Sequence, residues 1–254
     1  MRGIKGYALY AAGFFVVLEI MLAAAIYWWP TFAENIPSLK KFAAPIAALG
    51  QLVDQVDQFG VDGYVVGQHY FKGCGALGTA AAVLFAAPAI AGEAHRGTME
   101  MWLARPVSRA RLLTERWIGG ALAVAVPVFA TSLTVPLLLS LTGDKSMDWS
   151  DLLRCSLHMS LFLIAIYAVT FLWSSFGSEP MRISFTMLFI TVLLFALYLV
   201  EGVTNYSLFR LVDIEVFMEL VTSDALNWRI VGPLLAVTIV AYALSLRAFR
   251  VRVP

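Results

Sequence analysis

Charged side chains are scarce in this sequence: only 14% of its 254 residues are Asp, Glu, Lys or Arg, whereas 60% are hydrophobic. A soluble domain carries about 25% charged and about 45–50% apolar residues, so no soluble core would hide this much apolar surface. Histidine is also rare, and His69, His95 and His158 are too dispersed for a recognisable metal site. The composition therefore excludes a soluble domain and indicates an integral membrane protein.

Motifs for nucleotide binding and for common membrane enzymes are missing as well. No P-loop occurs, because residues 143–146 (Gly-Asp-Lys-Ser) lack the required spacing, so we expect that the chain cannot hydrolyse ATP by itself. Residues 73–78 match G-x-G-x-x-G, but they open an apolar helix instead of following a strand, and close helix packing is the better interpretation. Neither H-E-x-x-H nor a nucleophile elbow accompanies Ser156, His158 and Ser160. An intramembrane protease or lipid-modifying enzyme is therefore the weakest alternative.

What the sequence does contain is long apolar runs, each near the roughly 20 residues that cross about 30 Å of hydrocarbon. The first is followed by Trp28-Trp29-Pro30, which is typical of an interfacial anchor and not of a signal-peptide cleavage site. These runs predict an all-α integral membrane protein with a single transmembrane domain over residues 1–254 and six spans, at about 7–29, 73–92, 117–141, 155–173, 183–200 and 230–246.

Basic residues predict the orientation of these spans. Eleven of the 18 Lys and Arg residues fall on the side of the N-terminus, so we expect both termini and the loop 93–116 to be cytoplasmic. Most acidic residues fall on the other side. The inner basic cluster is a topology signal or a partner surface, and no nucleic-acid partner is expected.

Two outer segments, 30–72 and 201–229, are too patterned to be plain loops. In the first, apolar residues recur at helical spacing from Ile46 to Phe59, with Asp54 and Asp57 on the other face. In the second, Phe209, Val212, Val216, Phe217, Leu220 and Val221 alternate with charged residues. Each predicts an amphipathic helix, the first along the outer surface or on a partner and the second interfacial or partly re-entrant.

The inner loop 93–116 is the segment richest in local signals. A break at Gly97 and a capping Thr98 predict a short helix through Leu103 that ends before Pro106, and Ser108 is placed to cap the next helix. The short helix is expected to present an apolar knob surrounded by charges, which is typical of a protein docking site. A solvated loop made basic by topology is the alternative. The knob consists of Met99, Met101, Trp102 and Leu103, among Arg96, Glu100 and Arg105.

Within this loop Glu93, Gly97-Thr98 and residues 104–109 (Ala-Arg-Pro-Val-Ser-Arg) resemble the signature of ABC-2 type (type V exporter-like) permeases. These are the membrane subunits of ATP-binding cassette exporters. The resemblance implies six helices per subunit, pairing of two subunits and a coupling helix that docks on a separate ATPase. Carried over position by position, it implies ATPase docking at Glu93, Arg96, Gly97, Thr98, Glu100, Trp102 and Leu103, with Arg105, Pro106 and Arg109 shaping the following turn.

The same resemblance implies partners and a location. It places ATP and Mg on two copies of the ATPase and no cofactor on this chain, with a homodimer favoured over a heterodimer. Membrane lipid and an outer-face protein are further partners to expect. The implied location is the cytoplasmic (inner) membrane of a prokaryote, where the chain couples ATP hydrolysis to export or to force transmission. The cargo is not readable from the sequence.

Two features leave alternatives open. Glu19 lies near the middle of the first span, where an acidic residue marks a translocation path, a subunit interface or a hydrogen-bonded structural position. It is the main support for a rival function, an ion-gradient-driven secondary transporter. Cys74 and Cys155 both fall at outer helix ends; two buried free thiols are favoured over an outer-face disulfide.

Overall fold

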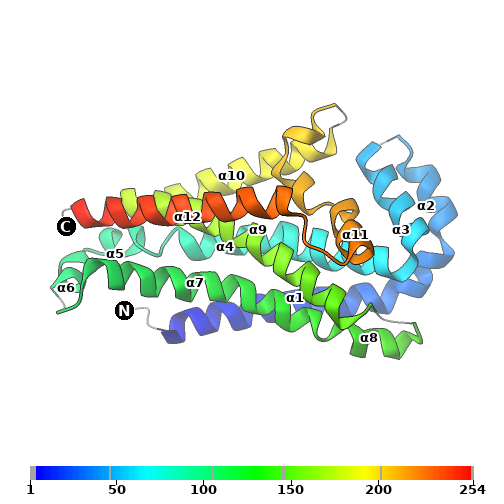
Figure 1. Ribbon diagram of the computed structural model, residues 1–254, viewed down its shortest axis with the longest axis horizontal. Coiled ribbons are helices and arrows are strands. Elements are labelled where there is room, and N and C mark those ends of the chain that lie inside the picture. The colour runs from blue at the N-terminus through cyan, green and yellow to red at the C-terminus, as the bar shows by residue number, and fades with distance from the viewer. Residues whose placement is uncertain (1–3, 46, 105, 145–146, 201, 253–254) are drawn as a thin grey trace.

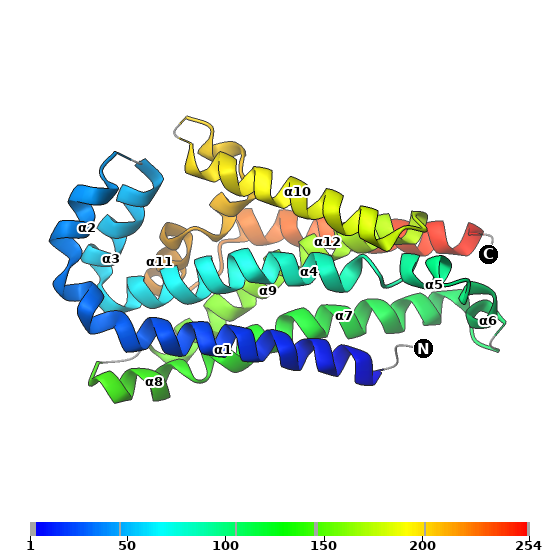
Figure 2. The same cartoon turned by 180° about the vertical axis from the view of Figure 1, so that it is seen from behind.

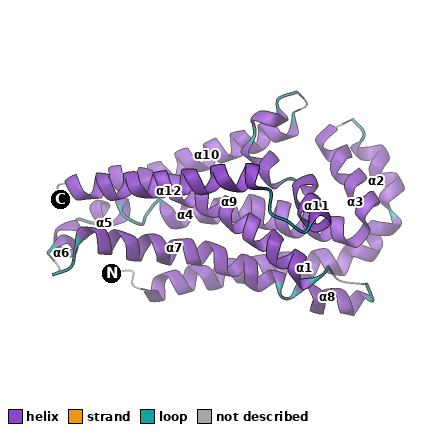
Figure 3. Cartoon of the chain, viewed as in Figure 1, coloured by secondary structure: helices purple, strands orange, loops and turns teal. Residues whose placement is uncertain are grey.

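The computed structural model describes residues 4–45, 47–104, 106–144, 147–200 and 202–252, and within these ranges every regular element is a helix (Figure 3). The long helices run side by side along one axis (Figure 1). Both termini lie at one end of this bundle, which we call the terminal end; the opposite end is the far end. The long helices are α1 (Ile4–Glu34), α7 (Arg109–Ser132), α9 (Trp149–Phe176), α10 (Pro180–Leu199) and α12 (Trp228–Val251).

Helix α9 is the centre of the bundle and packs against α12, α7 and α4 (Gly78–Ala86). Its buried residues are spread around the helix and include consecutive positions such as 165–168, as expected for a helix surrounded by other helices. Its Tyr167 is fully buried and lies against Gly120 of α7, where a Cβ atom would sit 2.1 Å from the tyrosine oxygen. The absence of a side chain at Gly120 therefore allows α7 and α9 to approach closely.

Five helical segments in the described part of the chain are long and apolar enough to cross a membrane. They correspond to five of the six predicted spans; one combines α7 with α8 (Val135–Thr142). Outward-facing side chains on α1 and α10 are apolar, including Val16, Ile20, Phe185 and Phe189. A surface of this kind is suited to hydrocarbon or to another protein and not to water.

The remaining predicted span, the second (73–92), is not one continuous helix. It is divided among a π-helix, η1 (Val66–Leu77), then α4, and then α5 (Ala91–His95), with a turn around Pro88. Figure 2 shows the short helix α4 lying among the long helices of the bundle. A broken backbone is tolerated there because neighbouring helices shield it and supply hydrogen bonds. The expected continuous helix is therefore wrong, although the segment does run along the bundle.

The first outer segment forms a helical hairpin at the far end, made of α2 (Ile36–Ala43) and α3 (Ala47–Val65). The predicted amphipathic helix is confirmed from Ala47 onward; Ile46 lies outside the described residues. Lys40 of α2 pairs with Asp54 and Asp57 of α3 at 2.9 and 2.8 Å. Gly60 has a φ of +60°, a left-handed conformation that kinks α3 where it enters the bundle.

The second outer segment, 202–229, folds back onto the far end through η2 (Thr204–Tyr206), η3 (Leu208–Val212) and α11 (Ile214–Ser223). The predicted helix is confirmed only from Ile214 onward, because extended Asp213 separates α11 from the 3-10 helix η3. The two elements together bury Phe209, Val212, Phe217 and Leu220. Asp213 caps α11 through its carboxylate, which also accepts a 2.9 Å hydrogen bond from the Tyr198 hydroxyl.

Candidate functional site

The loop between α5 and α7 forms a compact structure at the terminal end (Figure 1). Gly97, with a φ of +66°, ends α5, and the amide of Thr98 donates to the carbonyl of Glu93 at 3.0 Å. A short helix, α6 (Met99–Leu103), follows, and the hydroxyl of Ser108 caps α7 by accepting from the amide of Arg111. The helix boundaries expected from the sequence are confirmed.

Glu93 is the centre of a buried charge cluster, since its side chain is only 4% exposed. One carboxylate oxygen, Oε1, accepts from Arg116 at 2.8 Å and from Arg96 at 2.9 Å. The other, Oε2, accepts from the hydroxyl of Thr98. Burial by itself raises the pKa of Glu93, but the Thr98 hydrogen bond and the charges of Arg116 and Arg96 outweigh it and lower that pKa below its usual value.

Thr98 stands at the capping position of α6, but its hydroxyl does not cap that helix. It donates instead to the carboxylate and to the carbonyl of Glu93. The expected side-chain cap is therefore wrong. The hydroxyl ties the two short helices to each other by donating to an ionised carboxylate, a charge-assisted hydrogen bond that is stronger than one between neutral groups.

Arg116 connects this cluster to helix α6. Its guanidinium donates to the carbonyl of Ala89 at 3.1 Å and stacks over the ring of Trp102, 4.7 Å from the ring centroid. Trp102 also contacts Phe249 of α12, with ring centroids 5.4 Å apart. Trp102 thus binds α6 to both α7 and α12.

The exposed apolar knob expected from the sequence is smaller than predicted. Met99 and Trp102 are 3% and 4% exposed and point into the bundle. Met101 is 65% exposed, next to exposed Glu100 and near exposed Arg96. A five-residue helix has room for one buried face, and residues three apart share it, so Met99 and Trp102 take that face together.

The other predicted docking positions differ in exposure. Gly97 and Pro106 are exposed, Thr98 and Leu103 are partly buried, and Arg105 lies outside the described residues. Arg109 turns away from the loop. Its Nη1 atom donates to the carbonyls of Phe249, Arg250 and Arg252 at 3.3, 3.0 and 2.7 Å, so it satisfies the C-terminal end of α12.

Three residues that support this loop were not singled out from the sequence: Arg116, Ser174 and Phe249. Ser174 accepts from the amides of Ile90 and Ala91, both at 3.0 Å, and donates to the carbonyl of Ala87 at 2.8 Å. It therefore satisfies the broken backbone between α4 and α5. The only sequence signal was a polar residue near the end of an apolar span.

Glu19 makes an internal contact in this structure. Its Oε2 atom accepts from the hydroxyl of Thr134 at 3.0 Å, at the junction of α7 and α8. The side chain is partly buried, and the adjacent Ile20 is 64% exposed on the outer face of α1. This contact is the one expected of a hydrogen-bonded structural residue, while roles in a translocation path or a subunit interface stay predictions.

A second polar cluster is buried in the far half of the bundle. The hydroxyl of Tyr70 donates to Ser132 at 2.9 Å, and Ser156 donates to Ser132 at 2.7 Å. Cys74 and Cys155 are free thiols and both are buried, as favoured from the sequence. Among the described residues no group of three or more His, Cys, Asp or Glu side chains is arranged to hold a metal ion.

Comparison with known proteins gives one family. A family model described as ABC-2 family transporter protein matches residues 48–252. The match extends from α3 to α12 and includes the whole loop around α6, whereas Glu19 lies before it. No curated protein matches the chain.

Proposed function

We propose, from the premise that this chain belongs to the ABC-2 family of transporter proteins, that it is a permease subunit coupling ATP hydrolysis by a separate ATPase to transport. The chain is a multi-pass membrane protein, and members of this family generally serve as non-catalytic membrane subunits that work with an ABC ATPase. The proposal covers three points: that ATP hydrolysis is coupled to transport, in which direction transport runs, and which residues contact the ATPase.

The observation that supports this proposal most directly is the way α6 is held. Trp102 contacts both Arg116 of α7 and Phe249 of α12, and Glu93 also binds Arg116. Close-packed side chains are hardly compressible. A displacement of α6 therefore moves the ends of α7 and α12 with it. A partner that pushes on α6 therefore moves two long helices.

The ATPase is proposed to contact the exposed part of the loop. Met101 supplies an apolar contact, and Arg96 and Glu100 supply charges of both signs at its edge. Gly97 and Pro106 are exposed on the same loop. The remaining predicted docking residues act from beneath this surface: Glu93, Thr98, Trp102 and Leu103 position α6, and Arg109 ties the start of α7 to the end of α12.

ATP and Mg are proposed to bind to two copies of the partner, since the sequence contains no P-loop. Two permease subunits, most simply identical, are proposed to pair through apolar outer faces such as those of α1 and α10. The same faces are suited to lipid, so the pairing needs its own measurement. Export, or force transmitted to an outer protein, is the proposed outcome.

We place the chain in the inner membrane of a prokaryote with six crossings, the broken segment 73–92 being one of them. Two features support the orientation with termini inside. Both termini and α6 lie at one end of the bundle (Figure 1), and that end carries most of the arginines. A secondary transporter would depend on Glu19, whose described contact with Thr134 is internal to the chain and does not favour that alternative.

The test is to purify the tagged chain from its host in mild detergent and to identify any P-loop ATPase that accompanies it. A Met101→Asp/Glu100→Lys variant should lose the ATPase while keeping the parent's melting temperature. Met181→Asp is the matched control, because Met181 is 64% exposed and lies outside the loop. Repeated isolation of a stable parent without an ATPase would contradict the proposal, and equal loss in the control would remove α6 as the contact.

A further inference from the structure

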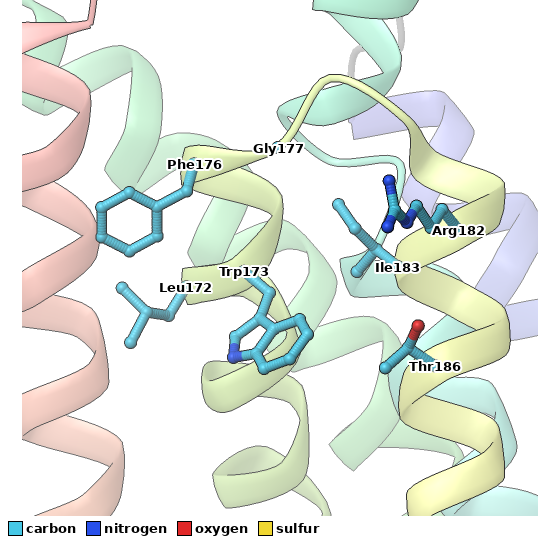
Figure 4. A pocket seen from close by; sticks show the side chains of 7 residues that line it. All are labelled: Leu172, Trp173, Phe176, Gly177, Arg182, Ile183 and Thr186. Atoms are coloured by element: carbon cyan, nitrogen blue, oxygen red, sulfur yellow. The ribbon is translucent and has the colours of Figure 1, made fainter.

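A groove lies between α9 and α10 near the terminal end, where the chain turns from one helix to the other. Its volume is about 440 Å³, within the roughly 300–1,000 Å³ of small-molecule sites. In Figure 4, Trp173 of α9 and Ile183 of α10 face each other across it, and Arg182 extends beside Ile183. The lining residues are Leu172, Trp173, Phe176, Gly177, Arg182, Ile183 and Thr186.

Arg182 is the one charged residue in this lining. It is exposed, and within the described parts of the chain it has no ion-pair or hydrogen-bond partner. The nearest acidic residue in sequence, Glu179, is engaged by His95 at 3.3 Å. Arg252 adds a second positive charge at the turn by donating to the carbonyl of Gly177 at 2.7 Å. The groove therefore offers a cationic mouth above apolar walls.

The surface around the groove indicates how a bound ligand would be oriented. Beyond the groove, α10 continues toward the far end with exposed Phe185, Phe189 and Val192. Trp173, 45% exposed, stands near the end of an apolar span, where tryptophan is typical of the membrane interface. An occupant that fits has an anionic head at the terminal end and a hydrocarbon tail running along α10.

We propose that this groove binds an anionic phospholipid from the leaflet next to the terminal end. Arg182 holds the phosphate, for which the planar guanidinium fork is well suited, and one acyl chain lies against Trp173, Ile183 and Thr186. Basic pockets between membrane helices bind anionic head groups in this manner. The lipid bridges α9 and α10 and does not require an ATPase, so this site stands apart from the proposed function.

The test is native mass spectrometry of the full chain in detergent, titrated with phosphatidylglycerol or with phosphatidylcholine of the same acyl chains. The parent should retain phosphatidylglycerol preferentially. Arg182→Gln should weaken that binding about tenfold or more, since a hydrogen bond to a charged group is removed. Thr186→Phe, which fills the groove, should weaken both lipids. Arg247→Gln makes the same charge change at the exposed terminal end of α12, outside the groove, and should leave binding unchanged.

Three results would overturn the proposal: equal retention of the two lipids by the parent, unchanged binding in Arg182→Gln, or equally tight binding of soluble glycerol phosphate, which indicates a simple anion site. ATPase capture is measured on the same samples. Loss of the ATPase with unchanged lipid binding would assign Arg182 to the partner surface. If Arg182→Gln does not fold, Arg182→Lys keeps the charge without the fork and should give intermediate affinity.

Discussion

Arg116 of α7 places its guanidinium 4.7 Å from the ring centroid of Trp102 in α6, while the same guanidinium binds Glu93 at 2.8 Å. Because the Arg116 guanidinium contacts both groups, a movement of either Glu93 or Trp102 away from it breaks one of the two contacts. The position of α6 is therefore coupled to the ionisation of Glu93 and to the end of α7.

We expect Glu93→Gln to destabilise the protein by about 3 kcal/mol, because it leaves Arg116 buried with its charge unpaired. Thermal unfolding in detergent measures this loss. Glu100→Gln is the control, since Glu100 is exposed on the same loop and should change the melting temperature little. Equal effects of the two substitutions would show that the Glu93–Arg116 pair contributes nothing specific.

The stabilisation by Glu93 should depend on pH. Its folded-state pKa is depressed below the ordinary 4.5, so its contribution is fully present above pH 4.5 and is lost as pH falls through the lower folded value. The difference in melting temperature between parent and Glu93→Gln should be constant from pH 7 to 5 and shrink below 4.5. A difference that grows on acidification would mean that the folded-state pKa is raised.

Ser174→Ala should destabilise the turn between α4 and α5 by about 2 kcal/mol, because two buried amides and one carbonyl lose their partner. Amide hydrogen exchange of residues 87–95 should rise. Ser175→Ala is the neighbouring control, since Ser175 donates only to the carbonyl of Phe171 in its own helix and should cost less. If both substitutions have the same effect, Ser174 does not support the broken backbone.

Gly120→Ala should destabilise by about 1–3 kcal/mol through overpacking, because its Cβ would lie 2.1 Å from the Tyr167 oxygen and 2.6 Å from the adjacent ring carbon. Tyr167→Phe in the same chain should restore part of the loss. Gly232→Ala in α12 meets nothing within 4 Å and should stabilise by about 0.5–1 kcal/mol. Destabilisation by both glycine substitutions would point to a general effect of helix glycines, not to the α7–α9 contact.

Short sequence signals predicted the helix boundaries correctly where residues close together in the sequence determine them. Gly97 and Pro106 bound α6, and Ser108 caps α7, because turn formation, helix termination and capping each involve residues a few positions apart. The same signals misjudged Thr98. Its hydroxyl was assigned to the nearest backbone amide, whereas the folded chain presents the carboxylate of Glu93 to it.

Exposure was harder to predict than helicity. Trp102 was expected at the surface because nothing near it in sequence covers an apolar side chain; Arg116 and Phe249, which do cover it, come from α7 and α12. The predicted second span is interrupted for a related reason. A continuous apolar run normally needs a continuous helix in lipid, but Ser174 of α9 satisfies the backbone of the broken segment.

The sequence by itself determined that this chain lies in a membrane, where its long apolar runs fall, and that it carries a loop of the ABC-2 type, because composition, span length and short motifs need no tertiary context. Only the tertiary structure decided which loop residues face outward, which arginines pair with the charge of Glu93, and where α9 and α10 leave a groove. Each of these depends on contacts between residues far apart in the chain, and burial and charge pairing arise only when those residues meet.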